Sequence, residues 1–293
     1  SDFVKQVGCC NSFEGDAAWV ILSPIEQSIK QKIEAVGTPL KDWDINIYRG
    51  VLTGCNEAFI ISTEKRDEIL ANCQTEEERK RTEELIRPIL RGRDIKRYGY
   101  NWANLWLINT HNGIRGKLER IHIENYPAVK EHLDQYWDKI SKRADKGDTP
   151  YNLRNCVYLE DFSKPKVMWK IIGCNINFSF DETNKVCNNA VDIMTGKRNQ
   201  LLQFVGLMNS KLFEWYLKLT TEAEVQGGGI QLYVTTLEKT LLKLDFPNNL
   251  NEVTEQRLNG LVSDEDVDKT IYSLYNLTKE EIDFIHFCKQ VNR

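Results

Sequence analysis

The stretch Arg87-Pro-Ile-Leu-Arg-Gly-Arg-Asp-Ile-Lys-Arg-Tyr98 joins a short apolar run to a dense group of basic residues. Between Arg87 and Arg120 there are eight Lys or Arg and two Asp or Glu, a surplus of six positive charges (eight minus two). The whole chain, in contrast, has a net charge of −4. A local surplus of this kind predicts either a solvated loop or a surface that faces a polyanion, and the rest of the chain must decide between them.

Length and composition indicate a folded protein of one large domain or two modest ones. The chain has 293 residues, of which 41% are hydrophobic and 28% are charged, as is ordinary for globular proteins. No apolar run approaches the roughly 18 residues of a membrane span, and the start at Ser1 lacks a signal-peptide pattern. We therefore expect a cytoplasmic protein with no membrane contact. The start also lacks Met, so we expect the chain to be part of a longer protein.

Eight cysteines are distributed without the spacing of a metal site. No Cys-x-x-Cys occurs, and no paired Cys/His spacing suits zinc. We expect free thiols in a reducing compartment, and we expect this chain to bind neither a metal nor another cofactor. A monomer is the simplest assembly.

Capping residues and hydrophobic periodicity predict a mixture of helices and strands. Ser23-Pro24-Ile25-Glu26 is a capping box that begins a helix, and Thr75 with Glu78 and Thr278 with Glu281 form two more. Apolar residues at helical spacing predict single helices over 127–144 and 199–219, with further helices over 64–72, 76–85, 264–275 and 279–290. Short alternating or apolar runs predict strands at 44–48, 58–61, 105–108, 167–172, 176–180, 190–194 and 230–234.

Motifs that would indicate an enzyme are absent from the sequence. There is no Gly-x-Gly-x-x-Gly, no Walker-type loop, no Gly-x-Ser-x-Gly and no Asn/Asp-Pro-Pro-aromatic signature of an amino-methyltransferase. Asp94 and Lys96 have the Asp-x-Lys spacing of some Mg²⁺-dependent nucleases, but the Pro-Asp step that commonly supplies the further acid does not occur. A stand-alone nuclease that uses Asp94 and Lys96 remains a minor alternative.

Binding of double-stranded DNA remains after this elimination. Lys and Arg supply most of the sequence-independent affinity for DNA and can read guanine, whereas Asn and Gln can read adenine. Glycines near 50–54 and 227–229 let backbone N–H groups approach phosphate closely. The predicted DNA-binding residues are Arg49, Thr53, Asn56, Arg87, Arg91, Arg93, Lys96, Arg97, Lys166, Lys170, Gly228 and Gln231.

Eight blocks of the sequence, in order, resemble the TaqI-like C-terminal specificity domain. This domain is the target-recognition part of adenine-specific DNA methyltransferases and of type IIG, Eco57I-like restriction-modification enzymes. One departure is Pro150, where the family pattern leads us to expect Trp. The blocks are Arg49–Ile61, Ile86–Tyr98, Trp106–Ile108, Tyr126–Val129, Tyr151–Arg154, Lys164–Val167, Leu207–Leu212 and Ile271–Ile282.

The resemblance implies an α+β fold, in which a recognition lobe with a mixed or antiparallel sheet is flanked by helices. It also implies a longer enzyme that binds S-adenosylmethionine, methylates adenine at N6 and in some members cleaves DNA with Mg²⁺. We expect this chain to be the non-catalytic reader of that enzyme. The expected domains are an N-terminal helical lead-in (1–43), a DNA target recognition domain (44–248) and a C-terminal helical segment (249–293) that docks on an N-terminal methyltransferase domain.

A protein-interaction or scaffold domain is the main rival to this interpretation. It predicts that the basic groups pair with the acidic helices and do not face solvent. The distribution of charge on the surface distinguishes the two.

Overall fold

The computed structural model describes residues 22–175, 177–220, 224–225, 229–243 and 248–291. The chain divides into two compact units. We call them the central unit (44–205 and 223–233) and the terminal unit (1–43, 206–222 and 234–293). Each unit is described by itself below.

Four antiparallel strands form the main sheet of the central unit, in the order β2-β10-β6-β8. In β10, Asp192 lies opposite Arg49 of one neighbouring strand and opposite Trp169 of the other. On one face of the sheet, Trp169 and Phe178 pack against Phe204 of α8 (Arg198–Met208), with ring centroids 6.4 and 5.2 Å apart. The strands are β2 (Ile45–Arg49), β6 (Lys166–Lys170), β8 (Phe178–Asp181) and β10 (Val191–Gly196).

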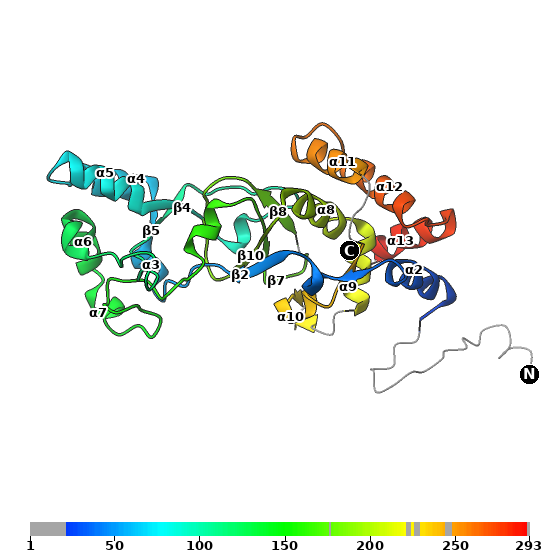
Figure 1. Cartoon of the computed structure of the whole chain (residues 1–293), viewed down its shortest axis with the longest axis horizontal. Coiled ribbons are helices and arrows are strands. Elements are labelled where there is room, and N and C mark those ends of the chain that lie inside the picture. Colours follow the sequence, from blue (N-terminus) through cyan, green and yellow to red (C-terminus); the bar gives the residue numbers. More distant parts are fainter. Residues whose placement is uncertain (1–21, 176, 221–223, 226–228, 244–247, 292–293) are drawn as a thin grey trace, which may run out of the picture. The chain divides into compact units, whose positions relative to one another are not determined.

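A mixed sheet in the order β3-β5-β4-β9 forms the rest of the central unit's framework (Figure 1). The pair β4 and β9 is parallel, and the other two pairs are antiparallel. Its strands are β3 (Ile60–Ser62), β4 (Ile86–Leu90), β5 (Leu105–Ile108) and β9 (Val186–Cys187). The helices nearby are α3 (Asn56–Phe59), α4 (Thr63–Ala71), α5 (Glu76–Leu85), α6 (Pro127–Asp134) and α7 (Trp137–Ile140).

Short elements complete the central unit. A three-stranded sheet consists of β7 (Ile172–Gly173), β11 (Glu224–Val225) and β12 (Gly229–Gln231), in the order β11-β12-β7. Three 3-10 helices are η2 (Gly92–Asp94), η3 (Ile123–Asn125) and η4 (Leu159–Ser163). The helix η2 follows directly on β4, so the basic stretch leaves the mixed sheet as a tight turn.

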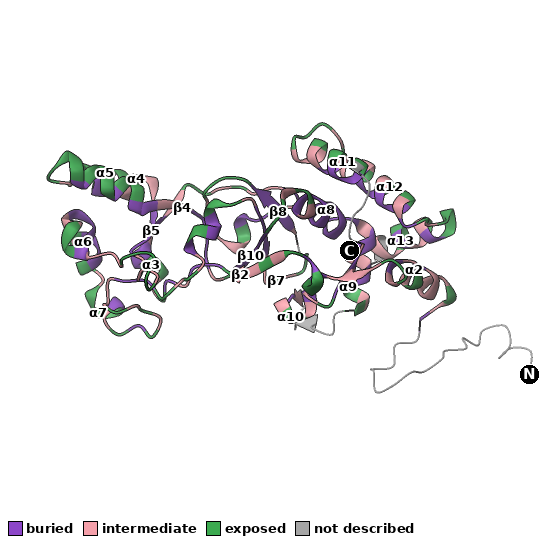
Figure 2. Ribbon diagram, in the orientation of Figure 1, coloured by how far each residue is buried: buried purple, intermediate pink, exposed green. Residues whose placement is uncertain are grey.

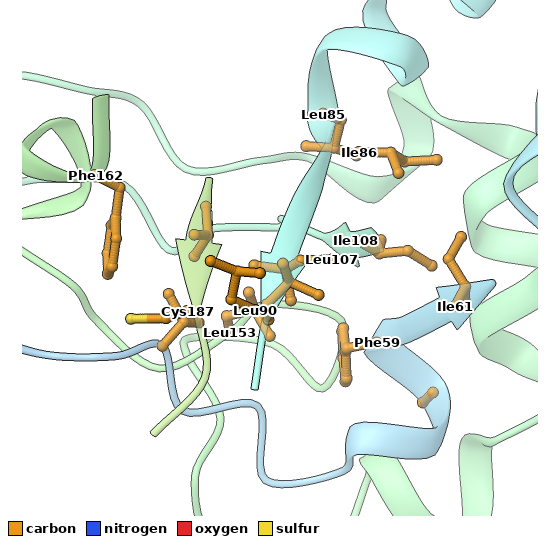
Figure 3. Packing of buried hydrophobic residues seen from close by; sticks show 14 of the residues in the cluster. Phe59, Ile61, Leu85, Ile86, Leu90, Leu107, Ile108, Leu153, Phe162 and Cys187 are labelled. Atoms are coloured by element: carbon orange, nitrogen blue, oxygen red, sulfur yellow. The ribbon is translucent and has the colours of Figure 1, made fainter. Parts of the chain in front are cut away.

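An apolar cluster joins the two larger sheets. Met168 and Ile193 come from the main sheet, and Leu90 and Leu107 come from the mixed sheet. Figure 3 shows Leu90 beside Cys187, its partner in β9, and Leu107 on β5, the strand on the other side of β4. Burial of these side chains stabilises the packing of the two sheets. Exposed residues are frequent on α5, outside this cluster (Figure 2).

The terminal unit is mostly helical. Lys32 of α2 forms an ion pair of 2.7 Å with Glu281 of α13, and Ser28 donates a hydrogen bond to the same carboxylate. Trp215 and Phe284 pack edge to face, with centroids 6.3 Å apart. The elements are α2 (Pro24–Glu34), β1 (Thr38–Pro39), η1 (Leu40–Asp42), α9 (Lys211–Thr220), α10 (Val234–Leu237), β13 (Leu241–Leu242), α11 (Asn248–Leu258), α12 (Asp264–Leu274) and α13 (Lys279–Val291).

The α+β fold class is confirmed, but several predicted elements are wrong in detail. The helix predicted over 127–144 is broken after Asp134, and the helix predicted over 199–219 is broken at Ser210. The Ser210 hydroxyl accepts from the N–H of Phe213, so it caps a new helix. The first part of the strand predicted at 58–61 is helical, and α11 was not predicted.

The capping boxes of Ser23 and Thr278 are confirmed. That of Thr75 is half right, because the Glu78 carboxylate accepts from the N–H groups of Gln74 and Ala128.

Across the described part of the chain, no helix has the length and apolar character needed to cross a bilayer.

Candidate nucleic-acid interface

Segments that are far apart in the sequence meet at one end of the main sheet. Arg49, at the end of β2, donates from Nε to the carbonyl of Asn189 at 3.2 Å. A Cβ placed on Gly92 would lie 3.5 Å from the Cβ of Ala190 and 3.6 Å from that of Lys170. The turn before β10 therefore contacts both the basic stretch and the end of β6. We call Arg49, Arg93, Lys96, Lys170, Gln231 and the turn Asn188–Ala190 the basic rim.

The basic stretch contributes exposed cations to the rim. Arg93 and Lys96 are exposed, and the Lys96 ammonium donates to the carbonyl of Arg93 at 2.9 Å. Within the described residues, the Arg93 side chain has neither an ion pair nor a hydrogen bond, so its guanidinium is available to an external anion. Arg97 is half-buried, with its guanidinium carbon 6.0 Å from the centre of the Tyr98 ring.

Arg91 is used within the stretch itself. Its guanidinium binds the Asp94 carboxylate through two hydrogen bonds, of 3.0 and 2.8 Å. Burial alone would raise the pKa of Asp94, but the hydrogen bonds and the positive charge of Arg91 hold that pKa below its usual range. This pair fixes the shape of η2, so Arg91 supports the rim and is not one of its free cations.

Lys170 and Gln231 close the other side of the rim. The N–H of Leu232 donates to the carbonyl of Ile171 at 2.9 Å, which places Gln231 beside the end of β6. The Lys170 side chain folds back over Gly173. A Cβ placed on Gly173 would lie 2.4 Å from Nζ of Lys170. Gly173 thus leaves room for the ammonium group, and a larger residue at 173 would displace it.

A buried carboxylate lies beneath the rim. Asp192 is opposite Arg49 in the sheet and is 4% exposed. Burial raises its pKa to about 6, and the positive charge of Arg49 opposes this rise. The negative charge of Asp192 is therefore costly in the folded state and is present at neutral pH.

Thr53 lies in the loop before α3, and Asn56 is the first residue of that helix. Thr53 is buried, and its hydroxyl donates to the side-chain oxygen of Asn56 at 2.6 Å. The guanidinium of Arg143 donates to the carbonyls of Thr53, Asp145, Pro150 and Asn152 and lies over the ring of Phe59. Asn56 is exposed, so it is the member of this predicted pair that can contact a ligand.

Arg87 and Lys166 also lie apart from the rim. The Arg87 guanidinium donates to the hydroxyl of Ser163 and to the carbonyl of Asn184, and burial lowers its pKa. Lys166 is fully buried, and its ammonium is 2.6 Å from Asp181. We therefore revise the expectation for Lys166, because an ammonium enclosed in this way does not face solvent.

Gly228, predicted to contact DNA, lies outside the described residues.

Sequence reasoning did not identify Asp192, Arg143 or Gly173. The sequence could have indicated that Asp192 is buried, because this carboxylate interrupts the apolar run Val191-Asp192-Ile193-Met194. No pattern in the sequence indicated the role of Arg143, since its four carbonyl partners are brought together by the fold. The described residues contain no group of three or more His, Cys, Asp or Glu side chains placed to hold a metal ion.

Comparison with known families identifies the chain. Residues 87–240, just over half of the chain, match the TaqI-like C-terminal specificity domain. The chain therefore belongs to the TaqI-like C-terminal specificity domain family, as the ordered blocks of sequence predicted. Among curated proteins, none shows significant similarity to the chain.

Two solved structures share the fold. One is the type IIG restriction endonuclease BpuSI, with a TM-score of 0.52 and 15% identity over 80% of this chain and 27% of that chain. The other is the type IIL restriction-modification enzyme MmeI in complex with DNA, with a TM-score of 0.55 and 13% identity over 87% of this chain and 36% of that chain. The chain thus spans about a third or less of the length of these enzymes.

Proposed function

We propose that the chain binds duplex DNA through the basic rim and selects the target sequence for a longer restriction-modification enzyme. The observation that carries this proposal is the meeting of Arg49, Arg93, Lys96 and Lys170 around one turn of the main sheet. Duplex DNA has one phosphate per roughly 1.7 Å of axis, so closely spaced cations on one surface match its charge. Membership of a specificity-domain family supports the same ligand.

Within the rim, we assign positioning to the cations and base reading to the amides. Asn189 and Gln231 carry the donor and acceptor pair that adenine requires, and both are partly exposed. Arg93 is the rim cation best suited to guanine or to phosphate, because its fork of donors is unoccupied. The parent enzyme would methylate adenine at N6 with S-adenosylmethionine, and its methyltransferase domain would precede this chain.

The arrangement favours recognition over the two rival functions. Both oxygens of Asp94 accept hydrogen bonds from Arg91, so this carboxylate is already engaged and is poorly placed for nuclease chemistry with Lys96. The rim cations also do not pair with the acidic helices α4 and α5, whose own charges are partly paired with each other, as in Arg66 with Glu83. A scaffold domain would require the rim cations to pair with these acidic helices.

Fluorescence anisotropy with a 40-base-pair duplex of arbitrary sequence tests the proposal. The double variant Arg93→Ala/Lys170→Ala should weaken binding on the order of tenfold at 50 mM salt, because two phosphate contacts are lost. The matched control is Arg79→Ala/Lys80→Ala, which removes two exposed cations from α5 and should bind as the unmodified chain does. Equal loss in both variants, or no binding by the unmodified chain, would overturn it.

The proposed parent activity has its own test. The longer protein that contains this chain should transfer tritium-labelled methyl groups from S-adenosylmethionine to adenine in duplex DNA. Substitution of Asn189 or Gln231 by Ala should relax or change the methylated sequence while leaving cofactor binding intact, because amide side chains read base edges. Methylation of cytosine, or an unchanged target in both variants, would contradict it.

A further inference from the structure

A second basic element lies in the central unit, in a hairpin that is not part of the rim. Ile114 and Leu118 pair across a tight turn, with N–H to O distances of 2.8 and 2.9 Å, and the N–H of Lys117 donates to the carbonyl of Ile114. Gly116 at the tip has a φ of +74°, which glycine adopts without strain. The turn therefore holds Arg115 and Lys117 in fixed positions on either side of Gly116.

The base of the hairpin is fixed by amide side chains. Asn112 donates to the side-chain oxygens of Asp148 and Asn155 and accepts from the N–H of Asp148 at 2.8 Å. Asn152, which is buried, donates to the carbonyl of Ile121 at 2.9 Å. At Gly113, with a φ of +72°, a Cβ would lie 2.5 Å from the carbonyl oxygen of Leu118. The hairpin is thus a built element and not a loose loop.

The hairpin borders an open hollow of about 670 Å³ with a positive balance of charge. Three basic residues line it against two acids. Asp148 is 3.8 Å from Arg120, and Glu119 is 3.1 Å from the imidazole of His122, which is charged only when protonated. Arg115 and Lys117 are exposed, and within the described residues their side chains form neither ion pairs nor hydrogen bonds. The two free cations are therefore available to an external anion.

We infer that this hairpin is a second DNA-binding element, which contacts phosphates outside the base pairs that the basic rim reads. The inference rests on the proposed function, since it assigns a second contact with the same ligand. The amide of Asn112, which lines the same hollow, is engaged by Asp148 and Asn155. Arg115 and Lys117 are therefore assigned to phosphates, and contacts of that kind contribute affinity that does not depend on sequence. The hairpin would hold the duplex while the rim samples different sequences, and it would contribute equally to target and non-target DNA.

The variant Arg115→Ala/Lys117→Ala tests this assignment in the full chain, with a 40-base-pair duplex of arbitrary sequence. Loss of two phosphate contacts should reduce the slope of log K against log salt concentration by about 1.8. Between 50 and 200 mM salt, the affinity of the unmodified chain should accordingly fall about tenfold more than that of the variant. Both side chains are exposed and, in the part of the chain that the structure describes, form neither ion pairs nor hydrogen bonds, so thermal unfolding should stay unchanged.

Two further variants separate this inference from the function on which it rests. Arg79→Ala/Lys80→Ala makes the same change in net charge on α5 and should keep the original salt slope. If Arg93→Ala/Lys170→Ala weakens binding while the hairpin variant matches this control, the hairpin assignment fails and the rim remains. If the unmodified chain does not bind the duplex at all, both proposals fail together.

Discussion

The buried carboxylate of Asp192 makes the stability of the protein depend on pH. Burial raises its pKa to about 6, whereas an Asp in an unfolded chain has a pKa of about 3.9. Between these two values the folded protein retains a proton that the unfolded chain has released. The cost of the charge is therefore absent below about pH 4, grows as pH rises, and is fully present above about pH 6.

Asp192→Asn should remove this cost. The free energy of unfolding should rise by about 1–2 kcal/mol at pH 7.5 and change little at pH 4, because the folded carboxyl is then neutral and the unfolded one is only about half ionised. Urea unfolding at the two pH values measures the difference. Asp138→Asn changes an exposed carboxylate and serves as the control. A gain of the same size at both pH values would show that the buried charge is not its cause.

Lys166 has a structural role, and its removal should be costly. Burial alone would raise the pKa of Asp181, but Lys166 and the hydrogen bonds from Thr183 hold it below its usual range. Lys166→Met would leave this carboxylate buried without its cation and should lower the free energy of unfolding by about 3–5 kcal/mol. Lys164→Met breaks a pair between the exposed Lys164 and Asp161, whose side chain is 13% exposed, and should cost about 1 kcal/mol. Similar losses in the two variants would contradict the assignment.

The basic residues in the sequence indicated a positively charged surface. The sequence did not show which of these cations are free and which pair with a carboxylate. Arg93 and Arg91 are two residues apart, yet one faces solvent and the other binds Asp94. The local pair of Arg91 with Asp94 could have been anticipated from its spacing of three residues. The partner of Lys166 is 15 residues away and is defined by strand pairing, which the sequence alone does not reveal.

Among the elements, the loop that follows α7 depends on one guanidinium. Burial lowers the pKa of Arg143 to about 10, and its donors reach four backbone carbonyls. A lysine has three donors on one atom and no flat surface to lie over Phe59, so Arg143→Lys cannot reproduce this geometry. The variant should lose about 2–3 kcal/mol of stability and expose Lys142 and Lys146 to faster cleavage by trypsin.

Arg154→Lys is the matched control for that experiment. Arg154 is exposed and makes one ion pair with Asp145 in the same loop. Its substitution keeps the charge and should leave the rate of cleavage unchanged. Equal cleavage of the two variants would show that the carbonyl contacts of Arg143 do not hold the loop.

Hydrophobic periodicity located most elements but not the breaks between them. The helix predicted over 199–219 has continuous apolar spacing, and the break at Ser210 depends on a hydroxyl that bonds Phe213. A serine within a helical pattern can cap or simply lie in the helix, so packing decides the outcome. No Gly or Pro lies near the break at Gln135, so the sequence did not predict it. We have no physical account of why the helix ends there.

On the scale of the whole molecule, a protein with a net charge of −4 is proposed to bind a polyanion. Local charge must therefore dominate the interaction at short range, because exposed charges more than about 8–10 Å apart are screened at physiological salt. Four rim cations and two hairpin cations should give a slope of log K against log salt concentration of about −5. Anisotropy titrations from 50 to 300 mM salt measure it, and a slope shallower than about −2 would contradict binding through these groups.

The family and the fold class were predictable from the sequence because eight ordered blocks carry the resemblance. The rim was not, since Arg49, Gly92, Lys170 and Ala190 are separated by up to 141 positions (190 minus 49). Their meeting follows from the strand order β2-β10-β6-β8, which brings the ends of β2 and β6 to either side of β10. The strand order of the sheet therefore shows which residues form the rim, and spacing along the chain could not.

The close fit at Gly50 shows that this position cannot accept a larger residue, whereas nearby positions of the basic rim can be substituted. A Cβ at Gly50 would lie 2.0 Å from the carbonyl oxygen of Asn188, so the turn before β10 is seated directly on that glycine. Asn189 is partly exposed, Arg93 is exposed, and neither belongs to the buried core. A combinatorial library that randomises Asn189 and Arg93 and preserves Gly50 would let directed evolution search for new target sequences on an intact scaffold.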